Sequence, residues 1–125
     1  MIHTHSPNLL AFAMANRALP ARYEAMLRFG QAEDVPVAPW APRGSERSVA
    51  GIVELVNAQP GTNAVLLGNH GVLVFGSTVE ATAGLLVILE EAAEAELQAA
   101  ALGGARDLPA DALAAVRASM SSVRN

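Results

Sequence analysis

Two apolar runs on either side of one sharp corner constrain the fold more than any other part of this 125-residue sequence. The chain reads NAVLLGN and then GVLVFG, and Asn69, His70 and Gly71 form the corner between the runs. Short continuous apolar runs bounded by turn residues are typical of strands buried on both faces. The pair therefore predicts the centre of a mixed, layered α/β domain.

Signals for helices surround these strands. Residues 1–4 are expected to end a strand, and Ser6-Pro7 then predicts a helix start, with Pro20 ending that element. A short helix is expected over residues 23–29, closed by Gly30, and the proline-rich segment 34–44 is expected to form a strand fragment and a loop.

Two more helices are predicted from caps and periodicity. Ser45 is expected to cap a helix with a buried apolar stripe, formed by Val49, Ile52, Val53 and Val56. The capping-box sequence of residues 77–80 starts the longest helix, which Gly103-Gly104 ends, with Glu90, Glu91, Glu94 and Gln98 on the face opposite its core face. A final short helix is expected around residues 109–120.

The three histidines of the chain form the main candidate site. His3 and His5 are two residues apart on a predicted strand, so their rings project from the same face. His70 lies at the corner between the apolar runs and is the only other histidine. Three imidazoles leave a fourth position on Zn²⁺ free for water or substrate. The alternative is an exposed pair of histidines and a turn histidine bonded to a backbone carbonyl.

Composition excludes several other classes of protein. The chain has no cysteine, which rules out disulfides and thiolate metal sites and suits a reducing compartment. The net charge is −4 and no basic run occurs, so nucleic acid is not an expected partner. The start has no signal-peptide pattern, and the longest apolar run, residues 83–89, is too short to span a membrane. A soluble, cytoplasmic protein without a membrane partner is expected.

The order of these motifs resembles the class II aldolase/adducin family. The resemblance rests on HTHSP before a helix, on APRGSERSVAGIVELV, and on AVLLGNHGVLVFG followed by the long helix. It implies a layered α/β/α domain with a mainly antiparallel central sheet, shortened at its N-terminus. Residues 1–103 would form the metal-binding domain, and residues 104–125 the C-terminal helix and tail of the same domain.

The resemblance also implies a function. His3, His5 and His70 would hold a catalytic Zn²⁺, or another divalent transition metal, that stabilises an enediolate. The chain would then be a metal-dependent lyase (an aldolase, or a related epimerase) acting on a small sugar phosphate. Two alternatives stay open: a non-catalytic metal-binding and interaction module, and a fragment of a split enzyme.

Family members carry further residues before the His-x-His strand, which supply the phosphate-binding loops and the acidic proton-transfer residue. No residue of this chain can be matched to these catalytic or substrate-binding roles. The carboxylates nearest to candidate loops are also readily explained as surface charges: Glu24, Glu33, Asp34 and Glu46. Arg22 and Arg43 would attract an anion or be ordinary surface arginines, and Tyr23 is out of register with the family's catalytic tyrosine.

Four features complete the expectations. Ser6 and Pro7 place a helix N-terminus beside the histidine pair, where backbone amides favour an anion or simply start a capped helix. Gly71 is expected to allow a special backbone conformation or a close approach. Glu96 would face a subunit interface or solvent. Because a shortened domain leaves a sheet face or edge uncovered, a homo-oligomer is expected, with the tetramer as the family's common form.

Overall fold

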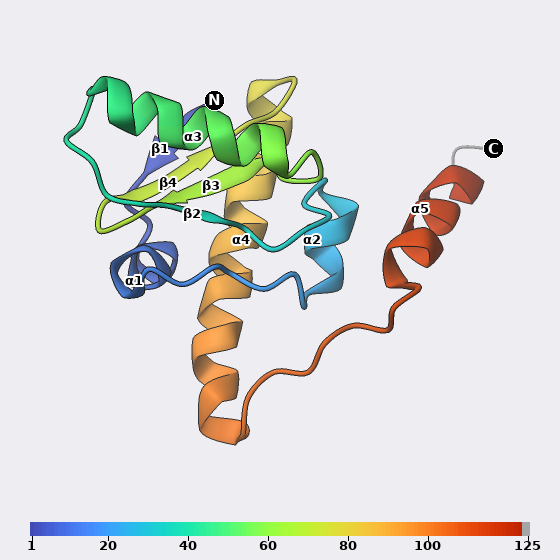
Figure 1. Cartoon of the computed structure of the whole chain (residues 1–125). Coiled ribbons are helices and arrows are strands. Elements are labelled where there is room, and N and C mark those ends of the chain that lie inside the picture. The colour runs from blue at the N-terminus through green and yellow to red at the C-terminus, as the bar shows by residue number, and fades with distance from the viewer. Residues whose placement is uncertain (124–125) are drawn as a thin grey trace.

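A four-stranded sheet lies at the centre of the structure, a computed structural model that describes residues 1–123 (Figure 1). The strands are β1 (Ile2–Thr4), β2 (Val37–Ala38), β3 (Ala64–Leu67) and β4 (Gly71–Val74), arranged in the order β1-β4-β3-β2. Strand β4 pairs antiparallel with both β1 and β3, whereas β2 pairs parallel with β3. The sheet is therefore mixed, with antiparallel pairing predominant, and the corner between the two apolar runs is confirmed.

Helices cover both faces of this sheet. They are α1 (Pro7–Ala15), α2 (Glu24–Arg28), α3 (Glu46–Ala58), α4 (Val79–Ala99) and α5 (Ala112–Val123), with a 3₁₀ turn at Ala100–Leu102. Helices α1 and α4 pack against each other and against β4, whereas α3 contacts β2 and β3. Figure 1 shows α3 in front of the sheet and α4 behind it, which is the expected layered α/β/α arrangement.

The main core lies between the sheet and the pair α1 and α4. Each of these elements contributes apolar side chains that are almost fully buried, among them Leu9, Ala13, Ala64, Leu66, Val72, Val74, Leu85 and Leu89. Removing this apolar surface from water stabilises the fold by roughly 25 cal/mol for each Å² buried. The core thereby fixes α1 and β4, and β4 in turn pairs with β1, which carries His3.

The predicted buried stripe of α3 is only partly correct. Val49 and Val53 are 56% and 51% exposed, whereas Ile52 and Val56 are half-buried. Val49, Ile52, Val53 and Val56 cover a wider arc of the surface of α3 than the part that contacts the sheet. One side of that arc faces β2 and β3, and the other side faces outward.

Helix ends differ from the sequence prediction by a few residues. Ser45 caps α3 as expected, because its Oγ accepts a hydrogen bond from the Ser48 amide at 3.2 Å. The cap of α4 is Thr78, so this helix begins one residue later than the capping-box pattern predicts. Helix α1 ends at Ala15, well before Pro20, because Asn16 adopts a left-handed conformation with φ 52°.

The C-terminal segment crosses from the end of α4 to α2. Helix α5 packs against α2, and the Arg22 side chain pairs with Asp107 in the connecting segment at 2.7 Å. Figure 1 shows α5 beside α2, away from the sheet. The domain boundaries at residues 103 and 104 stay a prediction, and the last two residues of the expected tail lie outside the described part. Within residues 1–123, no helix has the length and apolar character needed to cross a membrane.

Candidate metal centre

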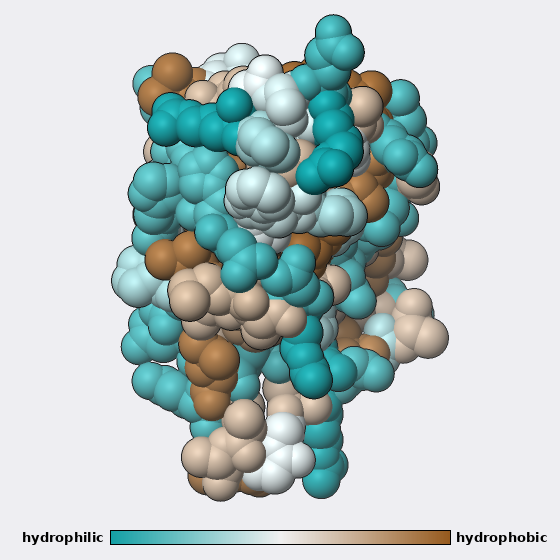
Figure 2. All heavy atoms as spheres, turned by 60° about the vertical axis from the view of Figure 1, so that its left-hand side comes forward, coloured by the Kyte–Doolittle hydropathy of each residue, from teal (hydrophilic) through white to brown (hydrophobic). Residues whose placement is uncertain are grey.

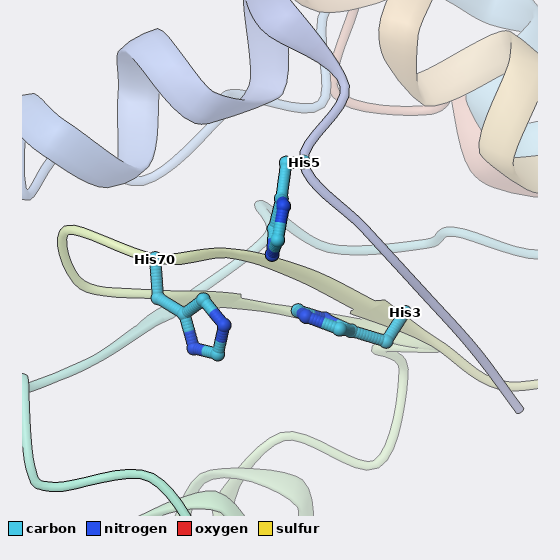
Figure 3. Close-up of side chains that lie close together, drawn as sticks. All are labelled: His3, His5 and His70. Carbon is cyan, nitrogen blue, oxygen red and sulfur yellow. The ribbon is translucent and has the colours of Figure 1, made fainter.

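The fold brings His3, His5 and His70 into one cluster. The ring centroids are 4.9 Å apart for His3 and His5, 4.7 Å for His3 and His70, and 5.2 Å for His5 and His70. Figure 3 shows the three side chains pointing toward one another, two from the β1 segment and one from the corner between β3 and β4. The expected convergence of His70 with two histidines at least 65 positions earlier in the sequence is therefore present in the structure.

Strand register explains why the cluster forms. His3 lies opposite Leu73 on β4, and His5 follows two residues later, so both side chains leave the sheet on the same side. The corner that carries His70 closes with a hydrogen bond from the His70 amide to the Leu67 carbonyl at 2.9 Å. Asn69 adopts a left-handed conformation, with φ 57°, which Asn tolerates better than most residues.

Gly71 is required at this corner because other groups approach its Cα closely. A Cβ built on Gly71 would collide with the Thr4 carbonyl oxygen and would lie 3.0 Å from Cδ2 of His5. The missing side chain therefore lets β1 and its two histidines lie against the corner. The expectation of a close approach at this glycine is confirmed.

Hydrogen bonding fixes which nitrogen of His3 is free. The Nδ1 atom lies 3.0 Å from the Val72 carbonyl oxygen, which can only accept, so Nδ1 carries the proton in the neutral ring. The lone pair of the neutral imidazole is then on Nε2. Orientation of a histidine by a backbone carbonyl in this way is the usual support for a metal-ligating ring.

Electrostatics favour the neutral form of His70. Partial burial lowers the pKa of His70, and electrostatic interactions with His3, His5 and Arg43 lower it further. A neutral imidazole is the form that binds a metal. Because Arg43 influences the pKa of His70, its guanidinium, on the loop between β2 and α3, lies close enough to act electrostatically on the cluster.

The donor set suits a transition metal. Each ring offers one nitrogen, and these three atoms lie within 4.8 Å of one another. Imidazole nitrogens around tetrahedral Zn²⁺ are separated by about 3.3 Å, a separation that small ring rotations would reach. His3 and His5 are exposed and His70 is half-buried, so the face between the rings is open to a small molecule.

A small cavity adjoins the cluster on the side of His70. Its volume is about 20 Å³, and it lies between the start of α3, the corner and the loop that follows β2; it is lined by Trp40, Ala41, Ser48, Gly68 and His70, among others. A space of this size holds one water molecule. Trp40 is 58% exposed, so this loop presents an aromatic surface close to the candidate metal centre.

The candidate carboxylates do not join the histidines in the described part of the chain. Glu24 pairs with Arg28 within α2 at 2.8 Å, and Asp34 accepts a hydrogen bond from the Ala21 amide. Glu33 packs against Gly61, and Glu46 lies in the first turn of α3. The metal-type cluster consists of the three imidazoles alone within residues 1–123.

Three other candidates take part in contacts away from the cluster. Arg22 pairs with Glu96 at 3.2 Å as well as with Asp107, so both the arginine and Glu96 are engaged within this chain. The Tyr23 hydroxyl donates to Glu91 at 3.0 Å, which raises the pKa of Tyr23 and keeps it protonated. Neither Arg22 nor Tyr23 is part of the metal-type cluster.

Glu90 is the residue that sequence reasoning missed. It was expected on the face of α4 opposite the core, yet its carboxylate accepts hydrogen bonds from the amides of Asn8 and Leu9 at 3.0 and 2.9 Å. Those amides form the helix N-terminus begun by Ser6 and Pro7, for which the sequence left two alternatives, an anion-binding site and a simple helix start. The anion at this position is the protein's own Glu90 side chain, and the Ser6 hydroxyl bonds Thr4 instead.

Comparison with known proteins identifies the family of the chain. Residues 1–97 match the model of the class II aldolase and adducin N-terminal domain, so the chain belongs to this family, as its motifs imply. A curated relative is the 5-methylthioribulose-1-phosphate/5-deoxyribulose-1-phosphate aldolase of Rhodospirillum rubrum, 29% identical over 111 residues. That alignment covers 89% of this chain and 48% of the relative.

Solved structures share the fold. An L-fuculose 1-phosphate aldolase superposes with a TM-score of 0.81 at 24% identity, covering 95% of this chain and 54% of the other. YgbL of Klebsiella pneumoniae, described as a candidate aldolase/epimerase/decarboxylase, has a TM-score of 0.70 at 28% identity, covering 91% and 55%. The chain therefore spans about half the length of the relatives it matches.

Proposed function

We propose that this chain is the metal-binding part of a class II aldolase-like lyase that acts on a small sugar phosphate. The observation that carries the proposal is the cluster of His3, His5 and His70, whose nitrogens lie within 4.8 Å of one another on an open face. Family membership supports the reaction class, and the relative from Rhodospirillum rubrum is itself an aldolase of sugar phosphates. We propose a cytoplasmic location, because the sequence has no cysteine and so lacks the disulfides that are common in proteins of oxidising compartments.

The three histidines are the proposed ligands, and zinc is the proposed metal. An all-imidazole set suits Zn²⁺ but also other divalent transition metals. When bound, the metal would act as a Lewis acid that stabilises negative charge developing on substrate oxygens. The chain's own contribution is to hold the rings: Val72 orients His3, Gly71 admits His5, and partial burial lowers the pKa of His70, which favours its neutral form.

Arg43 is the proposed partner for the anionic group of the substrate. Its charge acts on His70, and no described residue forms a salt bridge with it. An arginine that is not neutralised by a carboxylate attracts a phosphate group and can bind it through two hydrogen bonds. Arg22, the other candidate, is already paired with Glu96 and Asp107.

A homo-oligomer is proposed because apolar surface remains open. Val49 and Val53 of α3 face outward and border a hollow whose other lining residues are Gly44, Glu46, Ala50 and Glu54. The outer edge of β1 has no strand partner within residues 1–123. Figure 2, with the left-hand side of Figure 1 turned forward, shows apolar side chains interspersed with polar ones on this side of the molecule. Surfaces of this kind are commonly covered by another subunit.

One pair of measurements tests the proposal. Metal analysis of the purified protein should find one zinc, or a similar ion, per chain, and a panel of sugar phosphates should show metal-dependent cleavage that His70→Ala abolishes. Protein that takes up no divalent metal even when it is supplied in excess would overturn the metal centre. Stoichiometric metal without turnover of any sugar phosphate would favour the two alternatives, a metal-binding module without catalysis and a fragment of a split enzyme.

A further inference from the structure

Helix α1 is tied at its first turn to a carboxylate from a distant helix. Glu90, in the middle of α4, accepts hydrogen bonds from the backbone amide and side-chain amide of Asn8, at 3.0 and 2.9 Å, and from the Leu9 amide at 2.9 Å. A carboxylate at a helix N-terminus gains both from these charge-assisted hydrogen bonds and from the helix dipole. The first turn of α1 begins two residues after His5.

The other end of α1 is tied to the corner that carries His70. The Asn69 amide donates to the Ala13 carbonyl at 2.9 Å, and the Asn16 side-chain amide donates to Oδ1 of Asn69 at 2.9 Å. Contact is close here, because a Cβ on Gly68 would lie 2.8 Å from Oδ1 of Asn16. The residue bonded to the end of α1 is therefore the immediate neighbour of His70.

We propose that α1 is a brace between the two halves of the metal centre and that Glu90 is the positioning residue that holds it. This inference rests on the proposed metal site. The helix connects the His3 and His5 segment to the His70 corner, and its buried face, with Leu9 and Ala13 fully buried, cannot slide without disturbing the core. Glu90 fixes the start of the brace because Ser6, at the N-cap position, makes no capping hydrogen bond.

The physical consequence concerns ligand geometry. A metal ion binds most tightly when its three ligands are already in place, because ordering them on binding costs conformational entropy. Without the Glu90 carboxylate, the first-turn amides of α1 lose their acceptors and the turn frays. His5 then varies in position relative to His70, although every ligand is still present. Removing a group bonded directly to a metal ligand typically lowers metal affinity by about ten- to hundredfold, so the lower end of this range is expected for Glu90, which acts through α1.

Glu90→Gln is the variant of choice, because it keeps the size of the side chain and replaces one acceptor oxygen with a donor amide. We expect zinc affinity, measured by competition with a chelator, to fall by about tenfold. The visible spectrum of the Co²⁺-loaded protein should change, since it reports ligand geometry. Amide exchange at Asn8 and Leu9 should accelerate, whereas far-UV circular dichroism should confirm that the variant is folded.

Glu94→Gln is the matched control, one turn further along α4. It removes the same charge from an exposed carboxylate whose hydrogen-bond partner is Gln98 of the same helix. It should leave the zinc affinity, the Co²⁺ spectrum and the exchange at Asn8 and Leu9 at their wild-type values. An equal loss of affinity in both variants would overturn the proposal, because the effect would then come from charge alone.

A measurement without metal separates this inference from the proposed function. If the wild-type protein binds no metal, the proposed function fails, but the positions of the rings can still be followed by NMR of the metal-free protein. Glu90→Gln should then shift the ring resonances of His5 and weaken its contacts with His70. Ring resonances identical to those of the wild type, or an unchanged zinc affinity and Co²⁺ spectrum, would overturn the positioning role.

Discussion

The Nδ1 atom of His3 and the carbonyl oxygen of Val72 are 3.0 Å apart, across the antiparallel pair formed by β1 and β4. The backbone of one strand thus orients a side chain of its neighbour and directs Nε2 toward the other two rings. The site depends on strand pairing as much as on the histidines themselves. We therefore expect single changes in either strand to alter metal binding at the proposed site.

Removal of any one imidazole should abolish tight metal binding. His3→Ala, His5→Ala or His70→Ala each leaves two protein ligands, fewer than the three that catalytic zinc sites usually have. We expect zinc affinity to fall by at least about a hundredfold, measured by isothermal titration calorimetry or chelator competition. Because His3 and His5 are exposed, the metal-free His3→Ala and His5→Ala variants should unfold near the wild-type temperature. Wild-type affinity in any one of the three variants would contradict the assignment of that histidine as a ligand.

Gly71→Ala should damage the site although it removes no ligand. The new Cβ would meet the Thr4 carbonyl and Cδ2 of His5, so β1 would have to move away from the corner. Overpacking of this kind costs about 1–3 kcal/mol. Thermal unfolding should show the loss of stability, and zinc affinity should fall with it. Gly51→Ala is the control, since nothing lies within 4 Å of a Cβ at that position and alanine favours a helix.

Acid should weaken both the metal-free fold and metal binding. Because the pKa of His70 is lowered in the folded state, the unfolded chain takes up this proton at a higher pH than the folded chain does. The stability contribution is present above the unfolded value, near 6.5, and is lost as the pH falls toward the lowered folded value. Unfolding temperatures of metal-free wild type and His70→Gln, compared between pH 7.5 and 5.5, should show a steeper decline for the wild type. Parallel curves would show that His70 does not contribute.

The outward side of α3 should carry a subunit contact. Val53→Glu places a charge on a side chain that is 51% exposed, so the fold should tolerate it while association is disrupted. Sedimentation analysis should show a smaller species than the wild type. Val87→Glu is the matched control, an exposed valine on α4 at 60% exposure, and should leave the assembly intact. A wild-type protein that sediments as a monomer would overturn the proposed oligomer.

Local patterns predicted much of this fold from the sequence. The apolar runs of β3 and β4, the proline at the first position of α1 and the Ser45 cap all act within a few residues, so the sequence alone predicts them. The pairing of His3 and His5 also follows from strand periodicity. The proximity of both residues to His70 was expected from the number of histidines and the family resemblance. The structure explains this proximity by the register of β1 on β4.

Long-range contacts account for what the sequence did not predict. Glu90 has the spacing of a solvent-exposed helix position, and only the packing of α4 on α1 brings it to the amides of Asn8 and Leu9. The exposure of Val49 and Val53 was not predicted for the same reason. An apolar stripe along a helix shows which side chains are apolar, but it does not show which other element packs against them. Both depend on the relative placement of elements distant in the sequence.

Arg43 should determine the affinity of the site for anions. Loss of a charged hydrogen-bond donor to a phosphate costs about 1.5–3 kcal/mol, so Arg43→Gln should weaken the binding of inorganic phosphate to the zinc-loaded protein by about tenfold or more. Titration calorimetry at low ionic strength measures this directly, and added salt should reduce the difference because surface charges are screened. Arg47→Gln removes the same charge from the first turn of α3, without the influence on His70, and should have a much smaller effect. Equal weakening in the two variants would mean that only net charge matters. If phosphate binds equally well to wild type and Arg43→Gln, Arg43 does not hold the substrate anion, and the anion must be held by other residues.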